Sequence, residues 1–410
     1  MLQPLIAVHA GAGYHSEDKK KSYKSACMMA CTRAMKQLKA GESGLVAVTE
    51  AVLSLENSPM TNAGVGSSLT VLGEVECDAT VMDGESLLAG SVGALTGIKN
   101  PVCVALKILQ QQKLGKLSLG RLPPSFLVGR GASQWAVEHG FESTPQSTMI
   151  TETSMRFFEK HKKKLVTSER RMRRKREKRD DPGNNKKLKG DDENTRTSVV
   201  CVGPSTVQRV TDDKEASTPN THRHGDQLVS DQPISDTVGA VCIDGYGHMS
   251  SAVSSGGIPL KHSGRIGPAA VCGSGCWAYD CKGEDRPGVA IAVSGSGEDL
   301  MRTHFARECA QSVVTWDSAS RGVSQAFTDK FLTSEFLWDA KERLAGVLVL
   351  RQDRLEEKRN VEIVWSHSTS SMCVGYMLGN DSRAKALISR LPETGVAGYS
   401  LAMEGKQFTL

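Results

Sequence analysis

The chain has 410 residues, 39% of them hydrophobic, and its 40 glycines are typical of a globular α/β protein with many tight turns. No apolar run reaches membrane-spanning length, and no signal sequence precedes Val8. The 11 cysteines lack the spacing of a zinc site, even where Cys272, Cys276 and Cys281 cluster, so we expect neither a metal site nor membrane contact.

The net charge of +5 conceals an uneven distribution along the chain. Residues 156–189 contain 16 Lys and Arg against 5 Asp and Glu, which leaves a net charge of −6 for the rest. The body of the protein therefore has no charge-based reason to bind nucleic acid directly.

Residues 5–152 alternate predicted strands and helices. A short apolar strand, residues 5–9, runs into the turn His9-Ala10-Gly11-Ala12-Gly13, where glycine permits close backbone approach. Residues 56–67 form an Asn- and Gly-containing turn. The hydrophobic period predicts helices over residues 22–38, 45–55 and 102–112 and one that ends at Gly140, with strands over 75–81, 91–98 and 126–128.

A basic helix and a polar linker follow. Residues 153–179 have no interior Gly or Pro and predict one long helix, although repulsion between its cations weakens it. Basic blocks at 162–164, 170–176 and 186–189 are typical of a bipartite nuclear-import signal, with a solvated charged helix as the alternative. Residues 186–235 are polar and predict a disordered linker.

The linker ends at Asp236-Thr237, where a buried strand begins. Residues 237–244 and 248–255 predict a hairpin around the turn Asp244-Gly245-Tyr246-Gly247. If the Asp236–Thr237 bond were cut, Thr237 would carry both a hydroxyl nucleophile and an α-amine with a pKa of about 7.7–8.0, which suits a general base. The alternative is that Thr237 merely opens a strand.

The C-terminal half adds further strands and helices. Strands are predicted over 289–293, 346–350, 361–366 and 372–377, and helices over 298–314 and 323–332. The turn at Ser294-Gly295 precedes a helix N-terminus, which suits a developing oxyanion. Elements on both sides of residue 237 allow two stacked sheets covered by helices.

Four ordered motifs carry a family resemblance: Thr237–Val241, Ala252–Gly257, Lys261–Gly267 and Ser294–Glu298. With the turn at His9 and the loop around Asn62, they resemble the N-terminal-nucleophile hydrolases of the plant-type asparaginase group. The resemblance implies an α/β fold, the four-layer αββα sandwich, and two subunits. Residues 1–236 would form the α subunit, with 1–152 packed and 153–236 the basic helix and linker, and 237–410 the β subunit. The αβ heterodimer would arise from one precursor, with further pairing into a dimer of heterodimers.

The resemblance also assigns site residues. Thr237 is the nucleophile, its own amine is the base, Ser255 orients its hydroxyl, and Asn62 supports the site. Ser294 and Gly295 correspond to the oxyanion-hole pair, and Arg265, Gly11 and Gly257 to substrate-binding positions. His9 is interpreted as structural, with a catalytic base as the alternative. No cofactor is expected beyond a structural monovalent cation held by backbone carbonyls of Glu56–Ala63.

One departure from the family pattern bears on the substrate. Asparaginases of this group bind the substrate α-carboxylate with the arginine matching Arg265 and the α-ammonium with an aspartate three residues later, where this chain has Pro268. A peptide substrate has no such ammonium, and Arg265 would instead bind the side-chain carboxylate of the aspartate before the cut bond. We therefore expect a threonine endopeptidase that cleaves itself at Asp236-Thr237 and then cleaves nuclear transcription regulators after aspartate.

Two alternatives stay open: an asparaginase or isoaspartyl peptidase acting on small molecules, and a non-enzymatic nuclear adaptor. Location in the nucleus and also the cytoplasm is expected, with import receptors binding residues 160–189.

Overall fold

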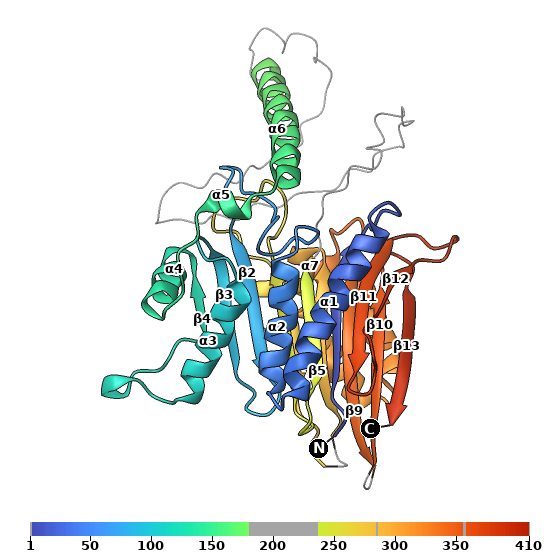
Figure 1. Cartoon of the computed structure of the whole chain (residues 1–410). Helices are drawn as coiled ribbons and strands as arrows, with labels where there is room; N and C mark the ends of the chain where they lie inside the picture. The colour runs from blue at the N-terminus through green and yellow to red at the C-terminus, as the bar shows by residue number, and fades with distance from the viewer. Residues whose placement is uncertain (1, 180–236, 284–285, 356–357, 410) are drawn as a thin grey trace, which may run out of the picture. The chain divides into compact units, whose positions relative to one another are not determined.

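The computed structural model describes residues 2–179, 237–283, 286–355 and 358–409 (Figure 1). The predicted linker and Asp236 lie outside these residues. Of the described residues, those within 2–162 and 237–409 belong to one compact unit, and 163–179, the C-terminal portion of one helix, belong to a second. Among the described residues, no helix is long and apolar enough to cross a membrane.

The first unit contains a larger and a smaller sheet. The order of strands in the larger sheet is β12 (Lys385–Arg390), β11 (Ser371–Leu378), β1 (Leu5–Gly13), β5 (Val238–Ile243), β6 (Met249–Ser255), β2 (Cys77–Asp83), β3 (Ala89–Leu95) and β4 (Phe126–Val128). The order in the smaller sheet is β13 (Ala402–Thr409), β10 (Lys358–His367), β9 (Ala345–Leu355), β8 (Gly288–Gly295) and β7 (Cys276–Tyr279).

Helices cover the outer faces of both sheets. On the larger sheet lie α1 (Lys20–Lys39), α2 (Gly44–Glu56), α3 (Pro101–Lys113) and α4 (Gly129–Glu138), as Figure 1 shows. On the smaller sheet lie α8 (Phe305–Thr315), α9 (Ala319–Ala326) and a π-helical turn, Phe327–Leu332. Shorter elements are α5 (Gln146–Met149), α7 (Gly297–Arg302) and 3-10 turns at Ser118–Gly120, Pro268–Ala270 and Glu335–Leu337. The predicted four-layer αββα sandwich is confirmed.

Strand β5 shows how the sequence produces these layers. Its side chains alternate, so Val238, Ala240 and Cys242 pack under the helices, whereas Val241 and Ile243 pack between the sheets. Both faces are buried, which explains why β5 is apolar throughout rather than alternating with polar residues. Thr237 directly precedes this central strand.

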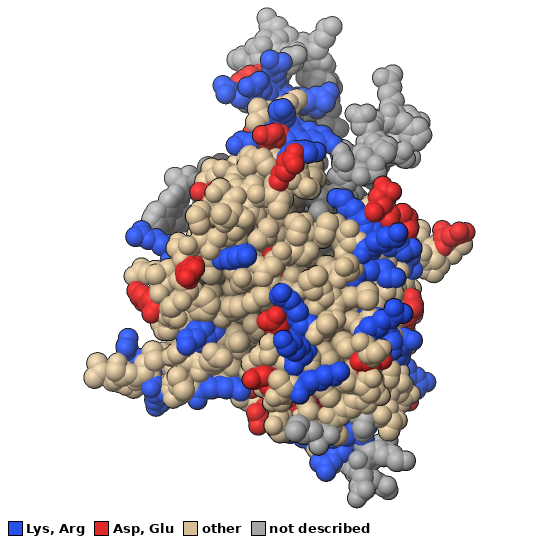
Figure 2. All heavy atoms as spheres, viewed as in Figure 1, with Lys and Arg blue, Asp and Glu red and all other residues tan. Residues whose placement is uncertain are grey.

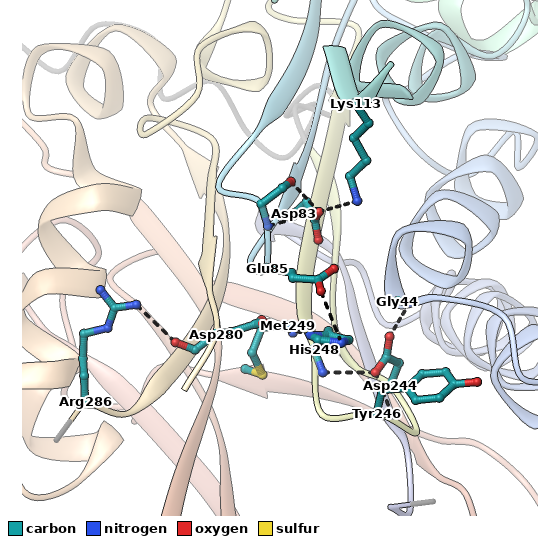
Figure 3. A network of polar contacts seen from close by, with 11 residues as sticks. Gly44, Asp83, Glu85, Lys113, Asp244, Tyr246, His248, Met249, Asp280 and Arg286 are labelled. Carbon is teal, nitrogen blue, oxygen red and sulfur yellow. Dashed lines mark hydrogen bonds and ion pairs between the residues drawn. The ribbon is translucent and has the colours of Figure 1, made fainter. Parts of the chain in front are cut away.

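The turn between β5 and β6 is fixed by Asp244. Its buried carboxylate accepts backbone N–H groups of Tyr246 and His248, at 2.9 and 3.0 Å, and of Gly44 at the start of α2, at 3.0 Å (Figure 3). Next to the turn, His248 Nδ1 lies 2.7 Å from Asp280 Oδ2. The predicted hairpin is therefore present and anchored to α2.

The basic helix α6 spans Glu152–Arg179. Figure 2 shows Lys and Arg side chains gathered along it, whereas positive and negative side chains are interspersed on the visible face of the first unit.

The structure differs from prediction at several elements. The expected helix over 298–314 is broken at His304, whose φ of 46° lies in the left-handed region, into α7 and α8. Strands β7, β12 and β13 were not predicted. β12 and β13 are sheet edges, and β13 is mostly exposed, so neither carries a clear apolar pattern.

Candidate active site

Pairing of β5 with β6 places Thr237 beside Ser255. Val238 lies opposite Ser254 in the ladder, so the residues just outside this pair are neighbours. Thr237 Oγ1 donates to Ser255 Oγ at 3.2 Å, and both residues are almost fully buried. Ser255 Oγ also accepts the N–H of Gly257 at 3.0 Å. The hairpin therefore brings together two hydroxyls that are eighteen residues apart in the chain.

The smaller sheet contributes Ser294 and Gly295 at the end of β8. Ser294 Oγ accepts the N–H of Ala12 at 3.0 Å and so links β8 to β1. Gly295 has a φ of 147°, and a Cβ at this position would lie 2.3 Å from the carbonyl oxygen of Leu344. Only glycine fits there.

An open cleft of about 420 Å³ joins these elements. Of the residues predicted for the site, the cleft is lined by Thr237, Ser255, Gly257, Arg265 and Gly295. Ser294, Gly11 and Asn62 do not line it. The Ser294 hydroxyl faces β1, where it accepts the N–H of Ala12, and Ala12 and Gly13, which follow Gly11 in the chain, line the cleft.

Asn62 holds the turn that follows Ser255. Its Nδ2 donates to the Gly257 carbonyl at 2.7 Å, its Oδ1 accepts the Ser68 N–H at 2.8 Å, and its own carbonyl accepts the Gly256 N–H at 2.7 Å. The resemblance predicted a supporting role, and the geometry places Asn62 where it can fix the backbone beside Ser255.

Lys261 was not predicted and holds the same turn. Its side chain is buried, and Nζ donates to the Gly256 carbonyl at 2.9 Å and the Glu76 carbonyl at 2.6 Å. A buried ammonium needs such partners. Nothing in the local sequence distinguishes Lys261 from a surface lysine, since one partner is a backbone carbonyl five residues away and the other, on Glu76, is 185 residues away.

Arg265 lies at the cleft with its guanidinium against three glycines. A Cβ on Gly257, Gly267 or Gly297 would approach its nitrogens to 3.1, 3.0 and 2.7 Å. Nε and Nη2 both donate to Glu298 Oε1, at 2.9 and 2.6 Å. The Arg265 side chain is 15% exposed and that of Glu298 56%.

The backbone after Arg265 is fixed by Asp78, a second unpredicted residue. Its carboxylate accepts the N–H of Gly267 at 2.7 Å and of Ala94 at 2.8 Å. Burial raises the pKa of Asp78, and Lys261, these hydrogen bonds and Arg265 oppose that rise. Pro268, next along the chain, is buried and lines the cleft.

His9 is a neutral, buried side chain. Its Nδ1 accepts the N–H of Gly11 at 3.4 Å, and burial lowers its pKa to about 3 against a smaller opposing effect from the Thr237 backbone. Its Nε2 lies 2.3 Å from where a Cβ on Gly239 would stand. A histidine with so low a pKa is a weak base at neutral pH, which agrees with the structural interpretation.

The loop expected to hold a monovalent cation offers backbone oxygens. The carbonyl oxygens of Pro59 and Thr61 each lie 3.4 Å from the position of the Cβ that Gly66 lacks, so they converge on one small space. Within the described ranges, no group of three His, Cys, Asp or Glu side chains could bind a metal ion.

Comparison with known proteins identifies related chains. The model of the family described as asparaginase matches residues 2–385. An isoaspartyl peptidase/L-asparaginase of Homo sapiens is 30% identical over 307 residues, which cover 75% of each chain. One from Rattus norvegicus is 31% identical over 304 residues, 74% of this chain and 69% of the relative. An isoaspartyl peptidase of Escherichia coli (strain K12) is 30% identical over 315 residues, 76% of this chain and 77% of the relative.

Proposed function

The chain belongs to the asparaginase family of hydrolases, and we propose that it is a threonine endopeptidase of the threonine aspartase type. It would cut its own Asp236–Thr237 bond and then cleave protein chains after aspartate. The observation that carries this proposal is a cleft in which Thr237 and Arg265 occur together while Pro268 stands where the family pattern has an acid.

Self-cleavage would begin with Thr237 Oγ. The hydroxyl attacks the Asp236 carbonyl carbon, the C–N bond breaks, and the freed nitrogen takes the proton, which leaves an ester between Asp236 and Thr237. Water then hydrolyses the ester and releases the Asp236 carboxylate. Ser255 Oγ accepts a hydrogen bond from Thr237 Oγ1 at 3.2 Å and would orient the attacking oxygen.

Substrate cleavage would repeat the attack with a better base. The free amine of Thr237 accepts the hydroxyl proton as Oγ attacks the substrate carbonyl, and it then protonates the leaving amine. Gly295, which lines the cleft, would donate its backbone N–H to the oxyanion, and Ser294 would complete the oxyanion-hole pair by holding the end of β8 against β1. Water hydrolyses the acyl-enzyme and restores Thr237.

A second candidate function is hydrolysis of β-aspartyl dipeptides or asparagine. The names of the relatives support it more directly than they support the endopeptidase. Two acids also line the cleft, Glu298 and Glu342, and either carboxylate could receive a substrate ammonium. Pro268 favours the endopeptidase, because the family aspartate is absent from its usual place.

A substrate panel separates the two candidates. The purified protein is assayed with matched peptides bearing Asp, Asn or Glu before the cut bond, with a β-aspartyl dipeptide and with free asparagine. The endopeptidase predicts cleavage of the Asp peptide far above the other four. Hydrolysis of the dipeptide or of asparagine at a rate comparable to the Asp peptide would overturn it in favour of the second candidate.

Further features follow from this proposal. Residues 1–236 and 237–410 become the α and β subunits of a heterodimer that can pair again. Basic residues within 160–189 bind nuclear import receptors, and nuclear transcription regulators are the substrates. A monovalent cation bound by the carbonyls of Pro59 and Thr61 would stabilise the loop that contains Asn62.

A further inference from the structure

The ion pair between Arg265 and Glu298 occupies the place that a substrate carboxylate needs. Both residues line the cleft that contains Thr237. One oxygen of Glu298 accepts from both Nε and Nη2, so the two donors on one edge of the guanidinium already face a carboxylate. At the other edge, Nη1 lies against the backbone of Gly257 and Gly267 and Nη2 against that of Gly297, so a second carboxylate binds in the same two-bond manner where Glu298 now sits.

Of the two partners, Glu298 is the one that can move. The Arg265 guanidinium is confined by the backbone at Gly257, Gly267 and Gly297, where even a Cβ would crowd it. The Glu298 side chain is 56% exposed. Its backbone lies in the first turn of the short helix α7, and its second carboxylate oxygen makes no hydrogen bond to the described residues. Glu298 can therefore swing into solvent while Arg265 stays in place.

We propose that Glu298 is an internal competitor for the substrate carboxylate and thereby a specificity-determining residue. In the free protein it neutralises Arg265, and a ligand binds only if its own carboxylate displaces Glu298. A neutral side chain, such as that of asparagine, cannot replace the lost ion pair, so Glu298 adds discrimination against it. The inference rests on the proposed function only in that Arg265 receives a substrate carboxylate, a requirement that both candidate functions share.

The expected effect is modest because Glu298 is exposed. Exposed ion pairs contribute little, so removal of the competitor should tighten carboxylate binding about two- to fivefold. Glu342 provides a matched control, since it also lines the cleft and is exposed but forms no ion pair with Arg265 among the described residues. Glu342→Gln removes the same charge without freeing Arg265.

The test measures binding of succinate, a four-carbon dicarboxylate, to the full-length protein by isothermal titration calorimetry at about 0.15 M salt, where the screening length is about 8 Å. Wild type, Glu298→Gln, Glu342→Gln and Arg265→Ala are compared. The inference predicts a Kd about two- to fivefold lower for Glu298→Gln, a Kd close to wild type for Glu342→Gln, and no binding by Arg265→Ala.

Three results would overturn the inference. Succinate could fail to bind both the wild type and Glu298→Gln, the Kd could fall equally in both glutamine variants, or the Kd of Glu298→Gln could be higher than that of wild type. The measurement requires no catalysis. A protein that binds succinate as predicted but hydrolyses none of the five substrates of the panel would overturn the proposed function and leave this inference standing.

Discussion

Arg265→Lys is the substitution that best tests how the cleft selects aspartate. The lysine keeps the positive charge but loses the planar pair of donors, and its ammonium cannot fill the space between Gly257, Gly267 and Gly297. Losing one charge-assisted hydrogen bond to a desolvated carboxylate costs about 1.5–3 kcal/mol. That corresponds to a fall of about ten- to over a hundredfold in kcat/KM.

Arg265→Ala removes both bonds and should lose more than about a hundredfold in kcat/KM. The assay follows cleavage of the Asp peptide under steady-state conditions. Arg302→Lys is a suitable control, since Arg302 pairs with exposed Asp339 at 2.7 Å and does not line the cleft. A kcat/KM for Arg265→Lys within twofold of that of Arg302→Lys would refute the assignment of Arg265 to the substrate carboxylate.

Three further predictions concern the framework and the basic segment. Asp244→Ala should lower the free energy of unfolding by about 2–4 kcal/mol, because three backbone N–H groups lose their acceptor, and urea denaturation measures this loss. Burial lowers the pKa of His248, but the hydrogen bond and charge of Asp280 and the charge of Glu85 outweigh burial and raise this pKa above its usual value. The stabilisation from protonated His248 should therefore be full below the unfolded-state pKa of about 6.5 and lost as the pH rises through the higher pKa of the folded protein. The difference in Tm between wild type and His248→Gln should be larger at pH about 5.5 than at pH about 8.5. An equal difference at the two pH values would contradict this prediction. Neutralising the six basic residues within 170–176 should move a tagged protein from the nucleus to the cytoplasm without blocking maturation, whereas unchanged nuclear signal would refute the import function.

The sequence predicted the layers well because the central strands are unambiguous. β5 is short, apolar and bounded by Thr237 and the Asp244 turn, and the structure confirms both strand and turn. Periodic helices such as α1 and α2 were also predicted to within a few residues. Edge strands such as β13 were missed because pairing with β10, and not their own burial, holds them in place.

Site residues were predicted from the sequence only where they lie in a recognisable local motif. Thr237, Ser255 and Arg265 lie in motifs that resemble a family, and the fold brings them to one cleft. Lys261 and Asp78 went unrecognised because each is held in part by a partner distant in the chain: Lys261 and Glu76 are 185 residues apart, and Asp78 and Gly267 are 189 residues apart. A buried lysine and a surface lysine look alike in a sequence, and only the packing separates them.

The central claim is that Thr237 becomes an N-terminal nucleophile. Intact-mass analysis and N-terminal sequencing of the purified protein test it most directly, with Thr237→Ala as the matched variant. We expect wild type to yield two fragments, residues 1–236 and residues 237–410 with a free α-amine on Thr237, and Thr237→Ala to stay one inactive chain of 410 residues. An uncut wild-type chain that still cleaves substrate, or a Thr237→Ala protein that matures at the same bond, would contradict the account.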